Sequence, residues 1–155
     1  MKEQNSDSQT FIVFQVAETW YALPSGNIQQ VEMIENITPV PNASEFVEGV
    51  VFTRGQVIPA LSLRSRFGFE RVSHTPRSRL IVTNLDGRVV GLVADSAREF
   101  IAIPATAMQP PPDGVSGLRG NYLKSVATVS SRLILVLDLN QLINIEETQA
   151  GLSRA

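Results

Sequence analysis

The sequence predicts an all-β protein that consists of two small barrels of about five strands each, related by an internal repeat. Three observations favour this fold class. Short β-branched runs are joined by two-residue polar turns, the runs recur in the same order in both halves, and helical periodicity is confined to two short segments. Closing each set of strands into a barrel removes the exposed edges that so many short strands would otherwise leave.

Four pairs of apolar runs are predicted to form hairpins with two-residue turns. The turns are Glu18-Thr19, Arg54-Gly55, Asp86-Gly87 and Ser130-Ser131. Asp86-Gly87 is the strongest signal, because a type I′ turn needs a positive φ at both central residues. Glu18-Thr19 and Ser130-Ser131 are weaker signals, so longer loops stay open at these two places.

The hairpins recur along the chain, and chance periodicity among strand-rich segments is the alternative reading of this pattern. Matching residues are Phe11 with Leu80 and Pro41 with Pro110 at an offset of 69, then Val50 with Val126 and Ser62 with Asp138 at 76. The repeat predicts a barrel core of apolar residues with equivalents in both halves. These core residues are Phe11, Val13, Val50, Ile58, Leu80, Val82, Val126 and Ile134.

The domain boundaries follow from the repeat and from the polar segments between hairpins. We expect residues 10–68 and 79–147 to form one barrel each, with the polar segment 69–78 as the linker. Residues 1–9 and 148–155 are expected to be flexible tails. Helical turns are expected within the two barrels at Leu61 to Arg66 and Asp138 to Asn144, the second because Leu139, Leu142 and Ile143 share one helical face.

Composition excludes several classes of function. The 155 residues include no cysteine, and the formal net charge is −2 with 13 scattered basic residues. Nucleic acids and anionic lipids need clustered Lys and Arg, so we expect neither as a partner. The polar first residues lack the apolar core of a signal peptide, and the apolar runs are far shorter than the ~20 residues of a membrane helix. A cytoplasmic protein without membrane insertion is therefore expected.

No catalytic or cofactor-binding motif is recognisable. His74 is the only histidine and lies in the polar linker, where a solvated loop residue is the simplest interpretation. Neither a nucleophile elbow nor a phosphate-binding glycine loop is present. With one histidine and no cysteine, a zinc site would rest on dispersed carboxylates. We therefore expect no enzyme activity, no cofactor and no metal.

Residues 40–68 carry a family resemblance. This segment reads Pro-Asn, a Gly-Val strand, Arg54-Gly55 at a hairpin tip, and then Ile58-Pro59 before a Ser-Leu-Arg. It resembles the signature stretch of the CheW family of chemotaxis adaptors, and the resemblance extends over Thr10 to Glu147. It implies two SH3-like barrels and no catalysis. It also implies two partners, the cytoplasmic tip of a chemoreceptor in the groove between the barrels and the regulatory domain of a CheA-like histidine kinase end-on.

The resemblance also implies which residues bind partners. Arg54 stands at the family's hairpin-tip arginine, and Ile28, Gln30 and Val31 fall on the strand that lines the receptor groove. Gln30 stands where the family usually has an acid. Phe52, in place of the usual Asn, is either an exposed anchor or a core residue. The other departures are Thr53, Ser62 and Ser125.

Two further expectations concern assembly and rival functions. Because closed barrels hide strand edges, the chain alone is expected to be a monomer or a weak self-associator. A barrel that binds nucleic acid is one alternative, but the net acidity and an aromatic content of 6% argue against a basic groove with stacking platforms. The other alternative is a different ligand-binding β-protein, in which Trp20 and Tyr21 would stack on the ligand.

Overall fold

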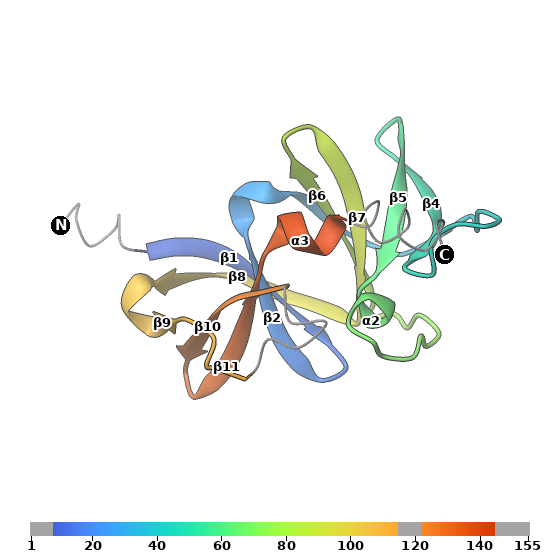
Figure 1. The fold of residues 1–155 in the computed structure, drawn as a ribbon. Coiled ribbons are helices and arrows are strands. Elements are labelled where there is room, and N and C mark those ends of the chain that lie inside the picture. Colours follow the sequence, from blue (N-terminus) through green and yellow to red (C-terminus); the bar gives the residue numbers. More distant parts are fainter. Residues whose placement is uncertain (1–7, 115–121, 145–155) are drawn as a thin grey trace.

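The computed structural model describes residues 8–114 and 122–144, and most of these residues lie in β-strands (Figure 1). The strands are β1 (Ser8–Val16), β2 (Thr19–Pro24), β3 (Ile28–Met33), β4 (Val47–Thr53), β5 (Gln56–Ser62), β6 (Arg79–Leu85), β7 (Arg88–Ala94), β8 (Ser96–Pro104), β9 (Met108–Gln109), β10 (Leu123–Val129) and β11 (Arg132–Leu137). The helices are the 3-10 turns η1 (Ser25–Asn27) and η2 (Ala105–Ala107) and the short α-helices α2 (Leu63–Arg66) and α3 (Leu139–Ile143). The expected all-β fold is confirmed. None of the described helices is long enough to cross a lipid bilayer.

All four predicted hairpins form, and each turns on two residues with positive φ. Asp86-Gly87, Arg54-Gly55 and Ser130-Ser131 are the turns that were predicted. The first turn is Ala17-Glu18 instead of Glu18-Thr19, because Thr19 pairs with Val16. No glycine or asparagine marks this turn, so the pairing of the flanking strands decides its position.

The strands form two sheets, in the orders β8-β1-β2-β11-β10-β9 and β3-β6-β7-β5-β4. We call these the first and the second barrel. The expectation that residues 10–68 and 79–147 form one barrel each is wrong. The hairpin β1–β2 belongs to the barrel that is otherwise built from the second half of the chain, and β6–β7 belongs to the barrel that is otherwise built from the first half. Parallel pairing of β2 with β11 and of β5 with β7 joins the two halves in each sheet.

The internal repeat is confirmed in the topology of the sheets. If β1, β2, β3, β4 and β5 are matched with β6, β7, β8, β10 and β11, the order of one sheet becomes that of the other. The register is also repeated: Ala22 pairs with Val136, and the equivalent Gly91 pairs with Ala60. Irregular pairing occurs at matching places, for example between Val47 and Gly49 in β4 and between Leu123 and Ser125 in β10.

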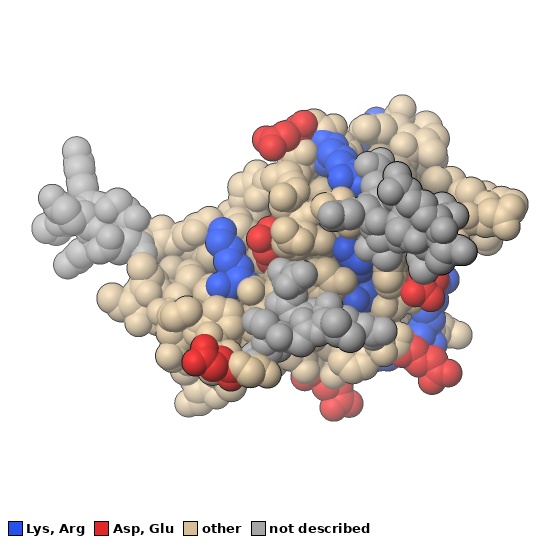
Figure 2. All heavy atoms as spheres, in the orientation of Figure 1, with Lys and Arg blue, Asp and Glu red and all other residues tan. Residues whose placement is uncertain are grey.

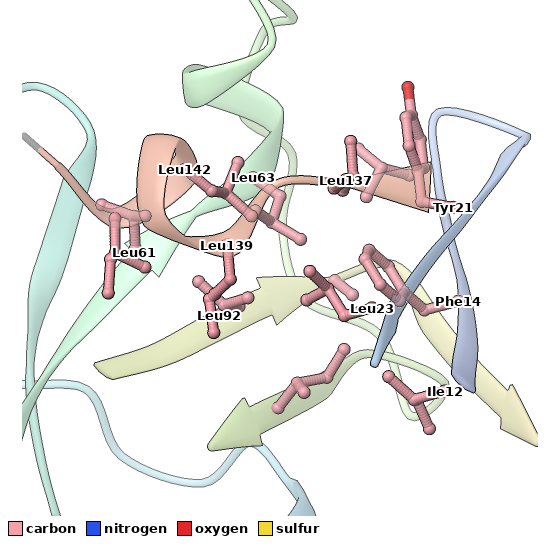
Figure 3. Close-up of a cluster of buried hydrophobic side chains, with 14 of the residues drawn as sticks. Ile12, Phe14, Tyr21, Leu23, Leu61, Leu63, Leu92, Leu137, Leu139 and Leu142 are labelled. Carbon is pink, nitrogen blue, oxygen red and sulfur yellow. The ribbon is translucent and has the colours of Figure 1, made fainter. Parts of the chain in front are cut away.

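Three apolar clusters fill the molecule. One lies inside each barrel, and the third, which we call the central cluster, lies between the barrels (Figure 3). Alternate residues of β1 serve two clusters, since Phe11 and Val13 face the first barrel while Ile12 and Phe14 face the central cluster. The middle of β1 is therefore buried on both faces, which explains the uninterrupted apolar run of residues 11–14.

Six of the eight predicted core residues are buried, and two are not. Val50 and Val126 are only half-buried, whereas the next residues, Val51 and Ala127, are in the barrel cores. Both positions follow an irregularity in the strand pairing. A bulge of this kind inserts a residue and changes which face the following side chains reach. The confirmed core residues are Phe11, Val13, Ile58, Leu80, Val82 and Ile134.

Each half ends in the predicted short helix. Helix α2 begins two residues later than expected because β5 extends to Ser62, and α3 begins one residue later because Asp138 is its N-cap. Ser62 and Asp138 occupy equivalent N-cap positions, and each side chain accepts a hydrogen bond from the backbone N–H three residues on. The predicted tail 1–9 is too long, since β1 begins at Ser8. The tail 148–155 lies outside the described residues.

Arg66 joins the two halves at the centre of the repeat. The residue is only 4% exposed, and its guanidinium lies 4.8 Å from the ring centres of both Phe46 and Tyr122. It donates hydrogen bonds to the carbonyls of Leu142 (2.8 Å) and Gln141 (3.0 Å) at the end of α3. Burial lowers the pKa of Arg66, against an opposing electrostatic effect of Tyr122. Leu142 stands 76 residues after Arg66, so the contact joins two equivalent positions of the repeat.

Candidate partner-binding surfaces

The tip of the β4–β5 hairpin carries the most exposed large apolar side chain of the described residues. Phe52 is 74% exposed, and Val57, which lies directly opposite it on β5, is 63% exposed. Arg54 occupies the turn at φ 51° and is exposed, and its side chain forms no hydrogen bond or ion pair with the described residues. The structure therefore places the predicted residues Phe52 and Arg54 together on one protruding surface, which we call the hairpin tip.

Strand β3 brings the other predicted residues to two different faces. Ile28 and Val31 are half-buried and pack against the central cluster, at the junction of the two barrels. Gln30 pairs with Val82, a core residue of the second barrel, so its side chain lies on the opposite face from Val31. The predicted groove strand thus contributes Ile28 and Val31 to the junction and directs Gln30 toward the second barrel.

The side chain of Gln30 belongs to a closed hydrogen-bonded trio with Glu32 and Thr53. Gln30 Nε2 donates to Thr53 Oγ1 at 3.0 Å and also to Glu32 Oε2. The hydroxyl of Thr53 in turn donates to Glu32 Oε2 at 2.8 Å. Since β3 and β4 are the two ends of the five-stranded sheet order, these side chains join strands that no backbone pairing joins.

Next to this trio lies a hollow of about 600 Å³. Its floor contains Val51 and Leu80 from the core of the second barrel, and its rim includes Glu32, Met33 and Phe52. The hollow is bordered by apolar and acidic side chains. It continues the exposed apolar surface of the hairpin tip toward β3.

Several exposed apolar residues were not predicted from the sequence. Val57 could have been found from the two-residue turn, which places it opposite Phe52. The repeat offers two more, because Phe100 is the equivalent of Val31 and Leu133 the equivalent of Val57, and these are 52% and 62% exposed. Met33 is 59% exposed and had no distinguishing signal in the sequence.

Beneath the linker, Arg64 and Asp95 form the best-connected ion pair of the described residues. Arg64 Nη2 lies 2.8 Å from Asp95 Oδ2, and the backbone N–H of Ala17 donates to the same oxygen at 2.8 Å. Burial opposes ionisation of the Asp95 carboxyl, but the hydrogen bonds from Arg64 and Ala17 outweigh it and lower the pKa of Asp95. The pair holds helix α2, the first hairpin and the start of β8 together.

The described residues show no cluster that could hold a metal ion. They contain no group of three metal-ligating side chains, and every buried side-chain nitrogen or oxygen among them has a hydrogen-bond partner. His74 lies in the linker, as expected, where Nε2 contacts Glu48 at 2.9 Å. The guanidinium groups of Arg98 and Arg132 both lie over the ring of Trp20, 5.6 and 4.6 Å from its centre, so the ring is not an open stacking platform.

Charged side chains are dispersed on the face of the molecule that Figure 2 draws. On the face drawn in Figure 2, Lys and Arg are separated from one another by uncharged or acidic residues and form no continuous basic surface. A nucleic-acid-binding groove requires such a surface. The distribution therefore does not favour the alternative of a nucleic-acid-binding barrel.

Comparisons with known proteins point to one family. The family described as the CheW-like domain matches residues 10–147. The chain is 27% identical to the chemotaxis protein CheW of Klebsiella aerogenes over 139 residues, which is 90% of this chain and 84% of that protein. It is 30% identical to protein FrzA of Myxococcus xanthus over 148 residues, 95% of this chain and 92% of FrzA. The crystal structure of the scaffolding protein TtCheW from Thermoanaerobacter tengcongensis superposes with a TM-score of 0.80 at 29% identity, over 88% of this chain and 92% of that one.

Proposed function

The chain belongs to the CheW-like domain family, and from this premise we propose that it is a non-enzymatic cytoplasmic adaptor that couples chemoreceptors to a CheA-type histidine kinase. The receptor contributes the helical hairpin of its cytoplasmic tip, and the kinase contributes its regulatory domain. The output is flagellar chemotaxis or a related motility system. By itself the adaptor is a monomer or a weak self-associator.

The observation that supports this proposal is the separation of two partly apolar surfaces. Ile28 and Val31 lie at the junction of the barrels, where an amphipathic helix would place its apolar face. Phe52 and Arg54 protrude at the hairpin tip, at the end of the second barrel. An adaptor must bind both partners at once, and separate surfaces allow this. Each binary affinity then needs to be only about micromolar, because the joint complex gains from effective concentration.

Competition between the two partners tests the proposal. Purified chain is titrated with a receptor-tip helical hairpin and with the kinase regulatory domain, first separately and then together, by isothermal titration calorimetry. We expect a ternary complex. If saturating kinase domain displaces the receptor tip, the two share one surface and the chain is not an adaptor of this kind.

Arg54 is the first residue to change. We expect the free energy of unfolding of Arg54→Ala to differ from that of the wild type by less than about 0.5 kcal/mol. An exposed turn side chain without partners among the described residues contributes little to stability. The same variant should bind the kinase domain at least about fivefold more weakly and the receptor tip normally. Arg88→Ala, at an exposed site after the β6–β7 turn, is the matched control. A large loss of thermal stability in Arg54→Ala would make the residue structural and remove it from the proposed surface.

A further inference from the structure

The repeat supplies an internal comparison for the trio of Gln30, Glu32 and Thr53. The equivalents in the first barrel are Glu99, Ile101 and Val129, by offsets of 69 and 76 residues. Ile101 and Val129 both pack against the apolar core of the first barrel. Two of the three counterparts in the first barrel are thus aliphatic, and the third, Glu99, lies 3.7 Å from Arg132 instead of joining a polar trio. The polar trio is therefore not something that the fold needs in order to close a barrel.

The trio also has a particular position between the two proposed binding surfaces. Gln30 and Glu32 lie on one face of β3, while Val31, between them, lies on the other face against the central cluster. Thr53 precedes the turn residue Arg54 directly and follows the exposed Phe52. A displacement of β3 at the barrel junction would reach Thr53, next to the hairpin tip, through these hydrogen bonds, since β3 and β4 are not paired in the sheet. The backbone bridge between Thr38 and Val50 links the segment after β3 to β4 farther from the tip.

From this arrangement we infer that Gln30, Glu32 and Thr53 are positioning residues that couple the barrel junction to the hairpin tip, so that a receptor helix bound against β3 changes the affinity of the kinase surface. The inference rests on the proposed function for the identity of the two partners. The coupled movement of β3 and the β4–β5 hairpin does not depend on which partners bind. A partly buried polar network is suited to this role, because its bonds are directional, whereas aliphatic contacts tolerate sliding.

The test replaces two members of the trio, Glu32 and Thr53, by their counterparts from the other barrel. The double variant Glu32→Ile/Thr53→Val reproduces the two aliphatic counterparts of the first barrel and should remain folded. The perturbation is Val31→Ala at the junction, and the measurement is amide hydrogen exchange of the β4–β5 hairpin relative to the β10–β11 hairpin. We expect Val31→Ala to raise the ratio of the exchange rates of the two hairpins at least about fivefold in the wild type. In the double variant the same change should raise this ratio less than about twofold. Gln29→Ala, an exposed change on β3, is the control. In a protein with this change, Val31→Ala should raise the exchange ratio as much as it does in the wild type.

If Val31→Ala raised the exchange ratio equally in the wild type and in the double variant, the inference would be overturned. A trio with a merely structural role would not change the effect of Val31→Ala on the β4–β5 hairpin. The second measurement uses the partners. In the wild type, saturating receptor tip should change the dissociation constant of the kinase domain at least about fivefold, as is typical of coupled sites. In the double variant the change should fall below about twofold while both partners still bind. A double variant that keeps the full coupling refutes the inference. If the wild type binds neither partner, the proposed function fails, and the exchange experiment still decides whether the two elements are coupled.

Discussion

The contact of Arg66 with α3 allows a stability prediction with a worked magnitude. Replacement by alanine removes two well-formed hydrogen bonds, to the carbonyls of Leu142 and Gln141, and a longer bond of 3.3 Å to the carbonyl of Asn144 that we expect to contribute little. Each lost partner costs about 1 kcal/mol or more. Removal of the buried aliphatic stem adds about 2 kcal/mol, at about 0.8 kcal/mol per methylene. We therefore expect Arg66→Ala to lower the free energy of unfolding by about 4 kcal/mol.

A second variant separates the two contributions. Arg66→Met keeps most of the aliphatic stem but lacks the guanidinium that lies 4.8 Å from the ring centres of Phe46 and Tyr122. Its cost should therefore be about 2 kcal/mol, from the lost contacts of the guanidinium. Urea denaturation followed by tryptophan fluorescence measures both values. In a protein of this size, 1 kcal/mol corresponds to roughly 2–4 °C in Tm. Arg77→Met, at an exposed position in the linker, is the control and should be neutral within about 0.5 kcal/mol.

One result would refute this reasoning. Burying a guanidinium is itself costly, and aliphatic replacements of buried charged groups are often neutral or stabilising. If Arg66→Met is as stable as the wild type, the cost of burial cancels the hydrogen bonds to α3. Arg66 would then fix the relative position of the two halves without stabilising them.

Two further predictions concern single contacts. Asp95→Asn should lose about 1 kcal/mol at pH 7, a value reduced because the pair with Arg64 is partly exposed. Because the folded-state pKa of Asp95 is lowered, the extra stability of the wild type is present above the ordinary carboxyl pKa of about 4 and is lost as the pH falls below it. Urea titrations of both proteins at pH 7 and pH 3 check this. A difference in the free energy of unfolding that does not shrink in acid contradicts it. Gly49→Ala should destabilise by about 2–3 kcal/mol in thermal unfolding, since its Cβ would lie 2.1 Å from the carbonyl oxygen of Thr38 at φ 154°. Gly26→Ala, with open space at its Cβ, should show no such loss, and equal effects at the two glycines would exclude the steric explanation.

The sequence alone was sufficient for the local structure. Hairpins form where two polar residues interrupt β-branched runs, and the turn residues determine three of the four turns in advance. The offset of the repeat predicted equivalent positions correctly, and Ser62 and Asp138, which it matched, both cap a helix in the structure. These features depend on backbone preferences and on side chains within a few residues, so they can be read along the chain. The exposed hairpin tip with Arg54 follows from the same local rules.

Other features depend on contacts between distant parts of the chain. The exchange of hairpins between the halves rests on the parallel pairs β2–β11 and β5–β7, and no local pattern distinguishes these from pairing within one half. Irregular pairing near Gly49 and Ser125 moved the core positions by one residue, from Val50 to Val51 and from Val126 to Ala127.

The candidate surfaces show the same division. The choice of β3 and of the β4–β5 hairpin came from the sequence and from family resemblance, whereas the direction of Gln30 toward Thr53 became visible only in the folded chain. The burial of Arg66 was equally invisible, since a Leu-Arg-Ser-Arg segment reads as a solvated helical turn. Sequence determines which residues a strand or turn presents. Only the tertiary structure decides what they meet, because that depends on pairing energies summed over segments more than 70 residues apart, such as Arg66 and Leu142.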